Sequence, residues 1–479
     1  MNGPIRRIAG FLFVAFTLLL LNVTYIQAIA TSKYRDNPLN PRVAASISGK
    51  ERGLIVTSDG TIVARSIADP NDPSRFAREY PEGPVYAHVV GYSSLLFGDE
   101  GLERVYADDL RSRRDLTVSD VINALMGRDL RPKSLELTLD NGLQHAAFDA
   151  LGDNTGAVVA IDPKTGAVLA MVSTPSYDPE VMLATNATKL RNALLDDPDE
   201  PLANRAVSRT YPPGSTFKVV VASSAVENGI AGPTTTFDDL VEFPLPGSTS
   251  TIHNYDRGLC GDGSTVTLSE AFRKSCNTIF ATLGLQVGGQ TLYDTAVSFS
   301  FDEPMRFDLP TQQSFFPDPS DLDGPALAQS SIGERDVRAT PLEMALVAAA
   351  IANDGNLMQP YLVSRIVDAA GGTVSEVTPE IRTAAVSAAT ATVVSQMMEE
   401  VVASGTGTRA TVPNVRVAGK TGTSDASSGS PAVWFIGFAP VDDPTIAIAV
   451  VVLNGGEDAT GGSVAAPIAG EILGYWLQP

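Results

Sequence analysis

A short stretch at residues 211–218, Tyr-Pro-Pro-Gly-Ser-Thr-Phe-Lys, constrains the fold of this chain more than any other feature. Two prolines and a glycine interrupt regular structure there, and the apolar run that begins at Val219 predicts a buried helix with Ser215 and Lys218 in its first turn. Residues three apart on a helix share a face, so the hydroxyl and the amine should lie within hydrogen-bonding reach. Such a pair is typical of an activated serine, because a hydroxyl is a weak nucleophile until a neighbouring group takes its proton. A Ser-x-x-Lys pattern alone, however, occurs readily by chance.

Two further motifs follow downstream. Ser275-Cys276-Asn277 lies in a predicted helix over residues 268–284, and Lys420-Thr421-Gly422-Thr423 ends a predicted strand over residues 415–423. Of the five lysines in residues 136–479, only Lys218 has a serine three positions before it. The ordered set Ser-x-x-Lys, Ser-x-Asn and Lys-Thr-Gly is specific as a whole, and it indicates acyl transfer through a serine ester.

The N-terminal segment predicts a membrane anchor. Residues 8–32 hold no charged side chain over 25 positions, and about 20 apolar residues suffice to cross a bilayer as a helix. Arg6 and Arg7 precede the run, so the positive-inside rule places residues 1–7 in the cytoplasm, 8–31 in the membrane and the rest outside. The alternative is that Ala28-Ile29-Ala30 is a signal-peptidase site. We favour the uncleaved anchor because the apolar run exceeds a typical signal-peptide core, and the bulk of the chain is exported in either case.

The net charge of −21 lies almost wholly in residues 136–479, which hold seventeen basic and forty acidic side chains. A surface of this sign repels phosphate backbones, which argues against nucleic acid as a partner. No Cys or His spacing indicates a metal site, and no cofactor is expected. The histidines, His88, His145 and His253, lie outside the nucleophile motif, so a serine–histidine triad is not expected.

Cys260 and Cys276 are the two cysteines of the chain. In an oxidising compartment a lone pair is expected to be bridged, and closing so short a loop contributes roughly 3 kcal/mol through loop-closure entropy. Two separate buried thiols are the alternative. Because Cys276 lies inside the Ser-x-Asn motif, a bridge would tie a loop to the rim of the candidate site.

Residues 32–135 and 136–479 differ in texture, which predicts two domains. The first is small and charge-balanced, with two short strands around Ser58-Asp59-Gly60, a polar loop over 66–84 and a helix near 101–113. The second predicts an α+β fold, in which a hairpin at 156–172 extends an antiparallel meander of three strands. Those strands are expected at 415–423, 432–439 and 445–453, with covering helices at 341–352, 384–403 and 464–477 and loops at 176–205 and 229–265.

The chain resembles the class B penicillin-binding proteins, the membrane-anchored D,D-transpeptidases of peptidoglycan synthesis, and its short N-terminal domain is most similar to the actinobacterial penicillin-binding protein A group. The resemblance implies an antiparallel sheet with helices on both faces, the fold shared with β-lactamases. Glu334 stands where members often have glutamine, and Cys276 replaces the aspartate of many relatives. Besides the three motifs, the resemblance rests on Arg52-Gly53, Gly101-Leu102-Glu103, Asn204-Arg205-Ala206, Ser331-Ile332-Gly333, Thr340-Pro341-Leu342 and Trp434-Phe435-Ile436-Gly437.

The resemblance also implies roles for the motif residues. Ser215 would attack the carbonyl of a D-Ala–D-Ala bond and hold the peptide as an ester until a stem-peptide amine takes it, and β-lactam antibiotics would acylate the same serine. Lys218 would be the base, kept neutral by burial and by the second cation Lys420. Ser275 would relay a proton to the leaving amine, and Asn277 would bind a backbone amide of the substrate.

The Lys-Thr-Gly strand would hold the terminal carboxylate of the substrate through Lys420, Thr421 and Thr423. Gly422 would let the substrate approach closely as an added strand. The backbone N–H groups of Ser215 and Thr423 would form the oxyanion hole.

Other functions remain in competition. A β-lactamase or a D,D-carboxypeptidase would share the acyl-enzyme, and a β-lactam-sensing receptor would use the domain as a binding module. The anchor and the preceding domain count against a secreted β-lactamase, and a cytoplasmic tail of residues 1–7 leaves no room for a signalling domain. The resemblance implies two partners besides peptidoglycan: the cytoplasmic membrane, and a polytopic SEDS-family glycosyltransferase contacted through residues 8–135.

Overall fold

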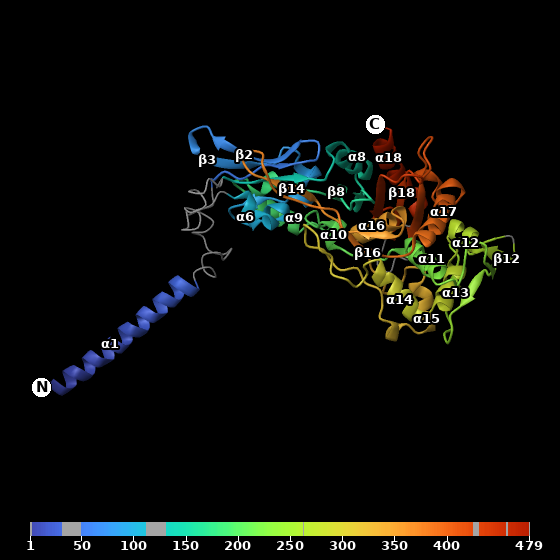
Figure 1. Ribbon diagram of the computed structural model, residues 1–479, viewed down its shortest axis with the longest axis horizontal. Coiled ribbons are helices and arrows are strands. Elements are labelled where there is room, and N and C mark those ends of the chain that lie inside the picture. Colours follow the sequence, from blue (N-terminus) through green and yellow to red (C-terminus); the bar gives the residue numbers. More distant parts are fainter. Residues whose placement is uncertain are drawn as a thin grey trace.

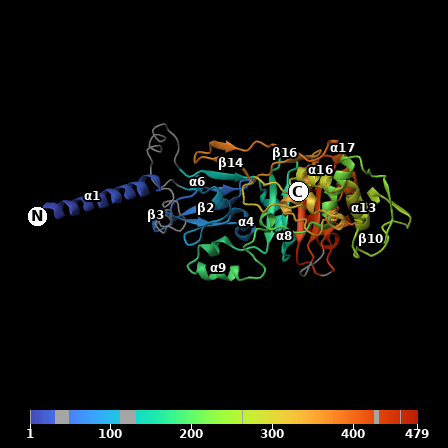
Figure 2. The same cartoon turned by 90° about the horizontal axis from the view of Figure 1, so that it is seen from below.

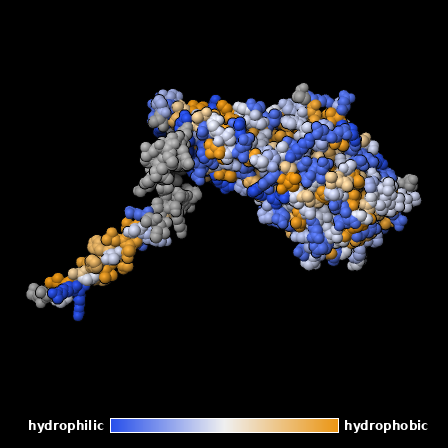
Figure 3. Space-filling model, in the orientation of Figure 1, coloured by the Kyte–Doolittle hydropathy of each residue, from blue (hydrophilic) through white to orange (hydrophobic). Residues whose placement is uncertain are grey.

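The computed structural model describes residues 2–30, 49–111, 131–261, 263–424, 431–456 and 458–478. The parts of the predicted N-terminal domain at 32–48 and 112–130 lie outside these ranges. Helix α1 (Asn2–Thr24) continues into a π-helical turn, Tyr25–Ile29. Its stretch Gly3–Gln27 has a mean hydropathy of 2.1 and no buried part, so it is long and apolar enough to cross a membrane (Figure 3). A signal sequence would have the same length and composition.

The site is built on a five-stranded antiparallel sheet. All residues of its three middle strands are buried, which explains their continuous apolar sequence, because helices cover both faces. The predicted meander and its extension by the 156–172 hairpin are confirmed. The strand order is β17 (Ala418–Thr423), β18 (Val433–Ala439), β19 (Ile446–Val452), β7 (Gly156–Ile161) and β8 (Val168–Thr174).

Helices α8 (Asn141–Leu151) and α18 (Ala466–Leu477) pack on one face of this sheet, and α16 (Pro341–Ala352) packs on the other (Figure 1). Helix α16 is buried at every residue but the last. It is apolar all round because α17 (Ala388–Ser404) and other helices cover the side that faces away from the sheet. The helices predicted at 341–352, 384–403 and 464–477 are therefore confirmed.

A second, six-stranded sheet joins distant parts of the chain. Its strands β14 and β15 come from beyond residue 360, and β14 pairs with β6, which spans the predicted boundary at residue 135 (Figure 2). The loop predicted over 66–84 is wrong, since most of it forms the β2–β3 hairpin. Strand β3 is an edge strand, where Pro73 breaks no ladder and polar side chains face solvent. The order is β15 (Thr373–Glu376), β14 (Val363–Val367), β6 (Ser134–Leu137), β1 (Ile55–Val56), β2 (Ile62–Asp69) and β3 (Asp72–Glu79).

Two other expectations are corrected. The single helix predicted over 268–284 is split into α12 (Leu268–Lys274) and α13 (Asn277–Val287), with Ser275 between them in the left-handed region at φ 64° and ψ 41°. The loop predicted over 176–205 contains α9 (Ala187–Leu195), a polar helix that buries only Ala187 and so lacks an apolar period.

The remaining helices are α4 (Ala87–Val90), α5 (Gly101–Val105), α6 (Ala107–Leu110), α10 (Arg205–Ser208), α11 (Lys218–Glu227), α14 (Gly289–Ser298) and α15 (Gly324–Ser330). Short helical turns are η2 (Gly83–Val85), η3 (Pro179–Met182), η4 (Gly214–Phe217), η5 (Pro319–Asp321), η6 (Thr408–Ala410) and η7 (Gly461–Ala465). Short paired strands are β4 (Ser93–Ser94) with β5 (Gly98–Asp99), β9 (Thr236–Asp238) with β12 (Thr265–Thr267), β10 (Glu242–Pro244) with β11 (Thr251–His253), and β13 (Asn356–Met358) with β16 (Ile381–Ala384).

Candidate active site

The serine segment is a 3-10 turn, η4, that leads directly into the buried helix α11. Gly214 has φ 51°, and a Cβ there would come within 2.7 Å of the carbonyl oxygen of Thr423. Only glycine therefore allows the turn to lie so close to β17. The indole of Trp434 donates a hydrogen bond of 2.9 Å to the carbonyl of Pro212 and fixes the turn from the other side. Ser215 in consequence lines a cleft of about 1070 Å³ beside the exposed edge of β17.

Two buried lysines meet at Ser275. Lys420 Nζ donates to Ser275 Oγ at 2.8 Å, and Lys218 Nζ lies 3.4 Å from the same oxygen. Lys218 Nζ also donates to the Ser275 carbonyl and to Asn277 Oδ1, both at 2.7 Å. Both lysine side chains are 0% exposed. Because Ser275 is left-handed and ends α12, its carbonyl and its hydroxyl both face Lys218.

Burial sets the protonation of these lysines. Burial, followed by the charge of Lys420, holds the pKa of Lys218 well below its usual range, and the carboxylate of Glu334 opposes the shift. Burial lowers the pKa of Lys420 to about 7. The expectation that burial and the second cation favour a neutral Lys218 is confirmed, so this amine is available as a proton acceptor near neutral pH.

The direct hydrogen bond expected between Ser215 and Lys218 is not formed. Within the described part of the chain the Ser215 hydroxyl has no hydrogen-bond partner, although it lines the cleft. The N–H groups of Lys218 are instead directed to Ser275 and Asn277. Catalytic hydrogen bonds are often longer in the ligand-free state and tighten when substrate binds, so the i, i+3 placement still suits proton transfer.

Asn277 is held at both ends of its amide. Its Oδ1 accepts from Lys218 Nζ at 2.7 Å, and its Nδ2 donates to the carbonyl of His253 at 2.9 Å. One N–H of the amide remains for the expected bond to substrate. The primary link of Asn277 within the protein is therefore to Lys218, which the sequence did not suggest.

Lys420, Thr421, Gly422 and Thr423 lie on β17 as predicted, and their side chains make specific contacts. Thr421 Oγ1 hydrogen-bonds Thr406 Oγ1 at 2.5 Å, and Thr423 Oγ1 accepts from the N–H of Gly461 at 3.2 Å. A Cβ on Gly422 would lie 2.7 Å from the Pro213 carbonyl and 2.9 Å from Thr216 Cγ2. The close approach that this glycine permits is thus that of the serine segment itself. No motif marked Thr406 or Gly461 in the sequence.

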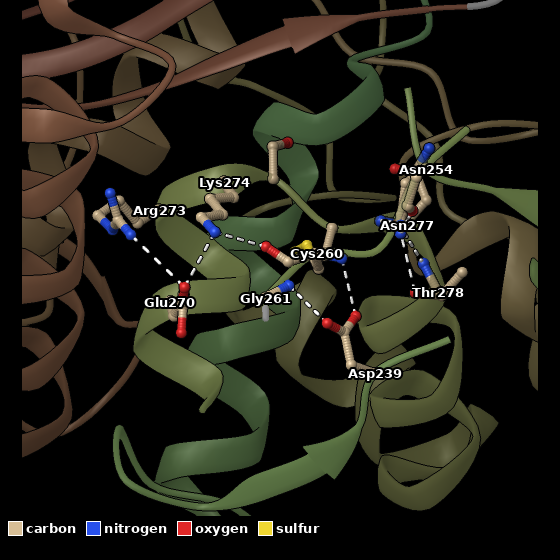
Figure 4. Close-up of a disulfide and its surroundings, with 12 residues drawn as sticks. Asp239, Asn254, Cys260, Gly261, Glu270, Arg273, Lys274, Asn277 and Thr278 are labelled. Atoms are coloured by element: carbon tan, nitrogen blue, oxygen red, sulfur yellow. Dashed lines mark hydrogen bonds and ion pairs between the residues drawn. A yellow bond between two sulfur atoms is a disulfide. The ribbon is translucent and has the colours of Figure 1, made fainter. Parts of the chain in front are cut away.

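Cys260 and Cys276 form a disulfide beside the cleft, with 6.0 Å between their Cα atoms (Figure 4). Asp239 accepts hydrogen bonds from the backbone N–H groups of Cys260 at 2.8 Å and Gly261 at 2.6 Å. Lys274 Nζ donates to the Cys260 carbonyl at 2.6 Å. The bridge therefore ties the loop around Cys260 to the Ser-x-Asn motif, where the sequence placed it.

The histidines lie elsewhere. His88 is enclosed, hydrogen-bonds the Pro201 carbonyl at 2.9 Å, and has its pKa lowered to about 4 by burial. His145 contacts Glu82, and His253 contacts Thr251 at the edge of the cleft. None hydrogen-bonds Ser215. Among the described residues no group of three or more His, Cys, Asp and Glu side chains could hold a metal ion.

Comparison with known proteins agrees with this geometry. Residues 156–474 match the penicillin-binding protein transpeptidase domain, and residues 52–135 match the penicillin-binding protein A dimerisation domain. The peptidoglycan D,D-transpeptidase PbpA of Mycolicibacterium smegmatis is 41% identical over 486 residues, which cover 98% of this chain and 97% of that relative. The PbpA of Mycobacterium tuberculosis is 39% identical over 500 residues, which cover 100% and 99%.

A solved structure supports the fold. Penicillin-binding protein A from M. tuberculosis, as a ceftriaxone acyl-enzyme complex, matches with a TM-score of 0.84 and 38% identity, over 91% of this chain and 100% of that one. The predicted α+β fold with helices on both faces of an antiparallel sheet is confirmed. With a family match over most of its length and relatives aligned end to end, this chain belongs to the penicillin-binding protein transpeptidase family.

Proposed function

We propose that this protein is a peptidoglycan D,D-transpeptidase, which cross-links stem peptides through an acyl-enzyme on Ser215 and is acylated by β-lactams at the same hydroxyl. The observation that carries the proposal is the pair of buried lysines at Ser275, in the cleft that Ser215 lines. Relatives named as D,D-transpeptidases align with nearly the whole chain, and a solved relative holds a β-lactam as an acyl-enzyme.

In the first step, Ser215 Oγ attacks the carbonyl carbon of the D-Ala–D-Ala peptide bond and its proton passes to the neutral amine of Lys218. The C–N bond breaks, and the leaving amine of D-alanine takes a proton through Ser275 Oγ, which lies 2.8 Å from Lys420 Nζ and 3.4 Å from Lys218 Nζ. In the second step, an amine of a neighbouring stem peptide attacks the ester, and Ser215 regains its proton.

Binding groups line the same cleft. The hydroxyls of Thr421 and Thr423, with Lys420 behind them, suit the terminal carboxylate of the substrate. The free N–H of Asn277 suits a backbone carbonyl of the peptide. The backbone N–H groups of Ser215 and Thr423 would stabilise the oxyanion, and losing one such donor typically costs about 3–4 kcal/mol of transition-state stabilisation.

The proposal includes the setting of the chain. Residues 1–7 would lie in the cytoplasm, 8–31 would be an uncleaved anchor, 32–135 would form an interaction domain, and 136–479 would act outside the membrane. The apolar helix and the match of 52–135 to a dimerisation domain support this division. Residues 8–135 would contact a SEDS-family glycosyltransferase in the same membrane. Protease added outside osmotically stabilised spheroplasts should digest residues 136–479, and protection of that part would contradict the orientation.

The test of the activity is the intact mass of the full-length protein in detergent micelles after incubation with benzylpenicillin. We expect a lasting one-to-one adduct on the wild type and on Ser298→Ala, a change of an exposed helical serine outside the cleft, and none on Ser215→Ala. Consumption of penicillin without an adduct would identify a β-lactamase instead. A donor peptide offered with and without an acceptor amine then separates cross-linking from simple hydrolysis, which would identify a carboxypeptidase.

A further inference from the structure

Helix α13 begins at Asn277 without a cap from its own chain end. The N-cap residue is Cys276, whose sulfur is in the disulfide and which makes no side-chain cap hydrogen bond. The first N–H groups of a helix have no partner within the helix, so another acceptor is needed when they are buried. This gap lies one residue after Ser275, at the centre of the candidate site.

Asn254 fills the gap from a loop 23 residues earlier in the chain. Its Oδ1 accepts from the backbone N–H of Asn277 at 2.9 Å and from that of Thr278 at 3.2 Å, and the Thr278 hydroxyl also lies 3.3 Å from it. The side chain is almost fully buried, at 6% exposed. Figure 4 shows Asn254 beside the start of α13, with Asn277 and Thr278 turned toward it. Asn254 thus caps α13 in place of the residue that normally would.

The neighbouring residue holds the side chain of Asn277. The carbonyl of His253 accepts from Asn277 Nδ2 at 2.9 Å, which leaves Asn277 Oδ1 directed at Lys218 Nζ, 2.7 Å away. His253 and Asn254 are consecutive, so one short segment fixes both the backbone and the amide of Asn277. Through Asn277 the same segment fixes the proposed base.

The segment is itself anchored. Asn254 Nδ2 donates to the carbonyl of Gly258 at 3.0 Å, which closes the turn that follows it. The far end of that turn is held by Asp239, which accepts from two backbone N–H groups, and by the disulfide to Cys276. A side chain in so fixed a loop can determine the position of what it contacts.

We infer that Asn254 is a positioning residue for acylation: by capping α13 it keeps Asn277 Oδ1 on Lys218 and holds Ser275 between the two lysines. The inference rests on the proposed function. A cap that served stability alone would lie anywhere on the surface of the fold, whereas this one contacts the residue that hydrogen-bonds the base. The sequence gives no sign of it, because Asn254 belongs to none of the three motifs.

The test compares the rate of acylation by benzylpenicillin over pH in the full-length protein and its variants. Asn254→Ala should acylate roughly ten- to hundredfold more slowly, as expected when a reacting group is displaced by about 1 Å. The ammonium of Lys218 would lose an acceptor, so its charged form would be less stable and the acid limb of the rate profile should move to lower pH. Asn254→Asp keeps the acceptor oxygens and should stay within about threefold of the wild type at its optimum.

The matched control is Asn353→Ala. Asn353 is a half-buried asparagine at the end of α16 whose amide donates to the Asn356 carbonyl, away from the cleft. Its loss should lower thermal stability without moving the acid limb. An Asn254→Ala variant with wild-type acylation would overturn the inference, as would one that is slowed only as much as Asn353→Ala with an unmoved limb.

If Asn254→Ala does not fold, Asn254→Gln replaces it. This variant keeps the polar group but extends it by one methylene, so it should be slow while Asn254→Asp is fast. Equal rates for the two would contradict the positioning role. Failure of the wild type to acquire the adduct would instead refute the proposed function, so the two failures are distinguishable.

Discussion

The two lysines predict how acylation depends on pH. Lys218 accepts a proton only when neutral, so the acylation rate should fall as the pH drops through its pKa, which burial and Lys420 hold low. Replacing the second cation in Lys420→Met removes a repulsion that disfavours the protonated Lys218, so the pKa of Lys218 should rise and the acid limb should move to higher pH. The measurement is the second-order rate of acylation by benzylpenicillin from acid to neutral pH.

The matched control for Lys420→Met is Lys164→Met. Lys164 belongs to a second Lys-Thr-Gly sequence, in the turn between β7 and β8, and its half-exposed side chain pairs with Asp443. Its loss should leave the pH profile unchanged. An acid limb that stays in place in Lys420→Met would show that the two cations do not interact as their burial implies.

Gly422 makes a steric prediction. In Gly422→Ala the new Cβ would lie 2.7 Å from the Pro213 carbonyl, so the serine segment or β17 must shift. Because a displacement near 1 Å can cost about a hundredfold in rate, acylation should fall by at least roughly tenfold. Gly474→Ala is the control, since nothing lies within 4 Å of a Cβ there, and in a helix the change should stabilise by about 0.5–1 kcal/mol. Equal acylation by both variants would mean that the segment tolerates the methyl group.

At this scale the sequence located the reactive groups but not their partners. Ser215 and Lys218 are recognisable because their relation is a spacing of three residues. The acceptor of Lys218 is Asn277, which lies 59 positions away, and its cap Asn254 is separated from it by another 23. Such relations follow only from the tertiary structure, since no local pattern encodes which loop lies beside which helix.

The disulfide gives a prediction for the loop that it closes. The cysteines are 16 positions apart, and a loop of about that length is worth roughly 3 kcal/mol when closed. The wild type should lose thermal stability in the presence of a reductant, whereas Cys260→Ala/Cys276→Ala should be insensitive to it. The measurement is the midpoint of thermal unfolding with and without reductant. A wild type that unfolds at the same temperature in both conditions would contradict the estimate.

Elements were predictable where burial is two-sided. Strands β7, β18 and β19 and helix α16 are continuous apolar runs because other layers cover both of their faces. Edge and surface elements were not. Strand β3 contains a proline and alternating charges that an edge tolerates, and α9 buries a single residue. The break at Ser275 was also missed, because residues 268–284 are helical by pattern and a left-handed residue within them is held by contacts to Lys218 and Lys420.

Across the whole molecule, the sheet that contains β14 binds the N-terminal part to the rest. Strand β6 lies between β14 and β1, so residues from both sides of position 135 share one hydrogen-bonded sheet. The composition change at that position predicted a boundary, but the pairing of a strand near 365 with one near 135 leaves no trace in composition. The two predicted domains are therefore expected to unfold together.

A buried charge cluster tests this coupling. Glu103 is 0% exposed and pairs with Arg52 at 2.5 Å and with Arg78 at 2.6 Å, and both arginines are also buried. Glu103→Gln would leave two buried guanidinium groups without a charge partner, a change that typically costs about 3–5 kcal/mol. Since the cluster lies under the shared sheet, the whole chain should unfold in one transition at a lower temperature, and acylation of Ser215 should be lost at that temperature.

The control for this variant is Glu79→Gln, whose partner Arg65 is 43% exposed; a pair so exposed is worth about 0–1 kcal/mol, so its midpoint should barely move. The informative comparison is between unfolding and activity in Glu103→Gln. If an early transition leaves acylation intact until a second, higher one, the N-terminal part melts alone and the sheet does not couple the halves. Coincident loss of both would mean that the stability of the catalytic site depends on residues 52–103, because β6 and β14 transmit it through their hydrogen bonds.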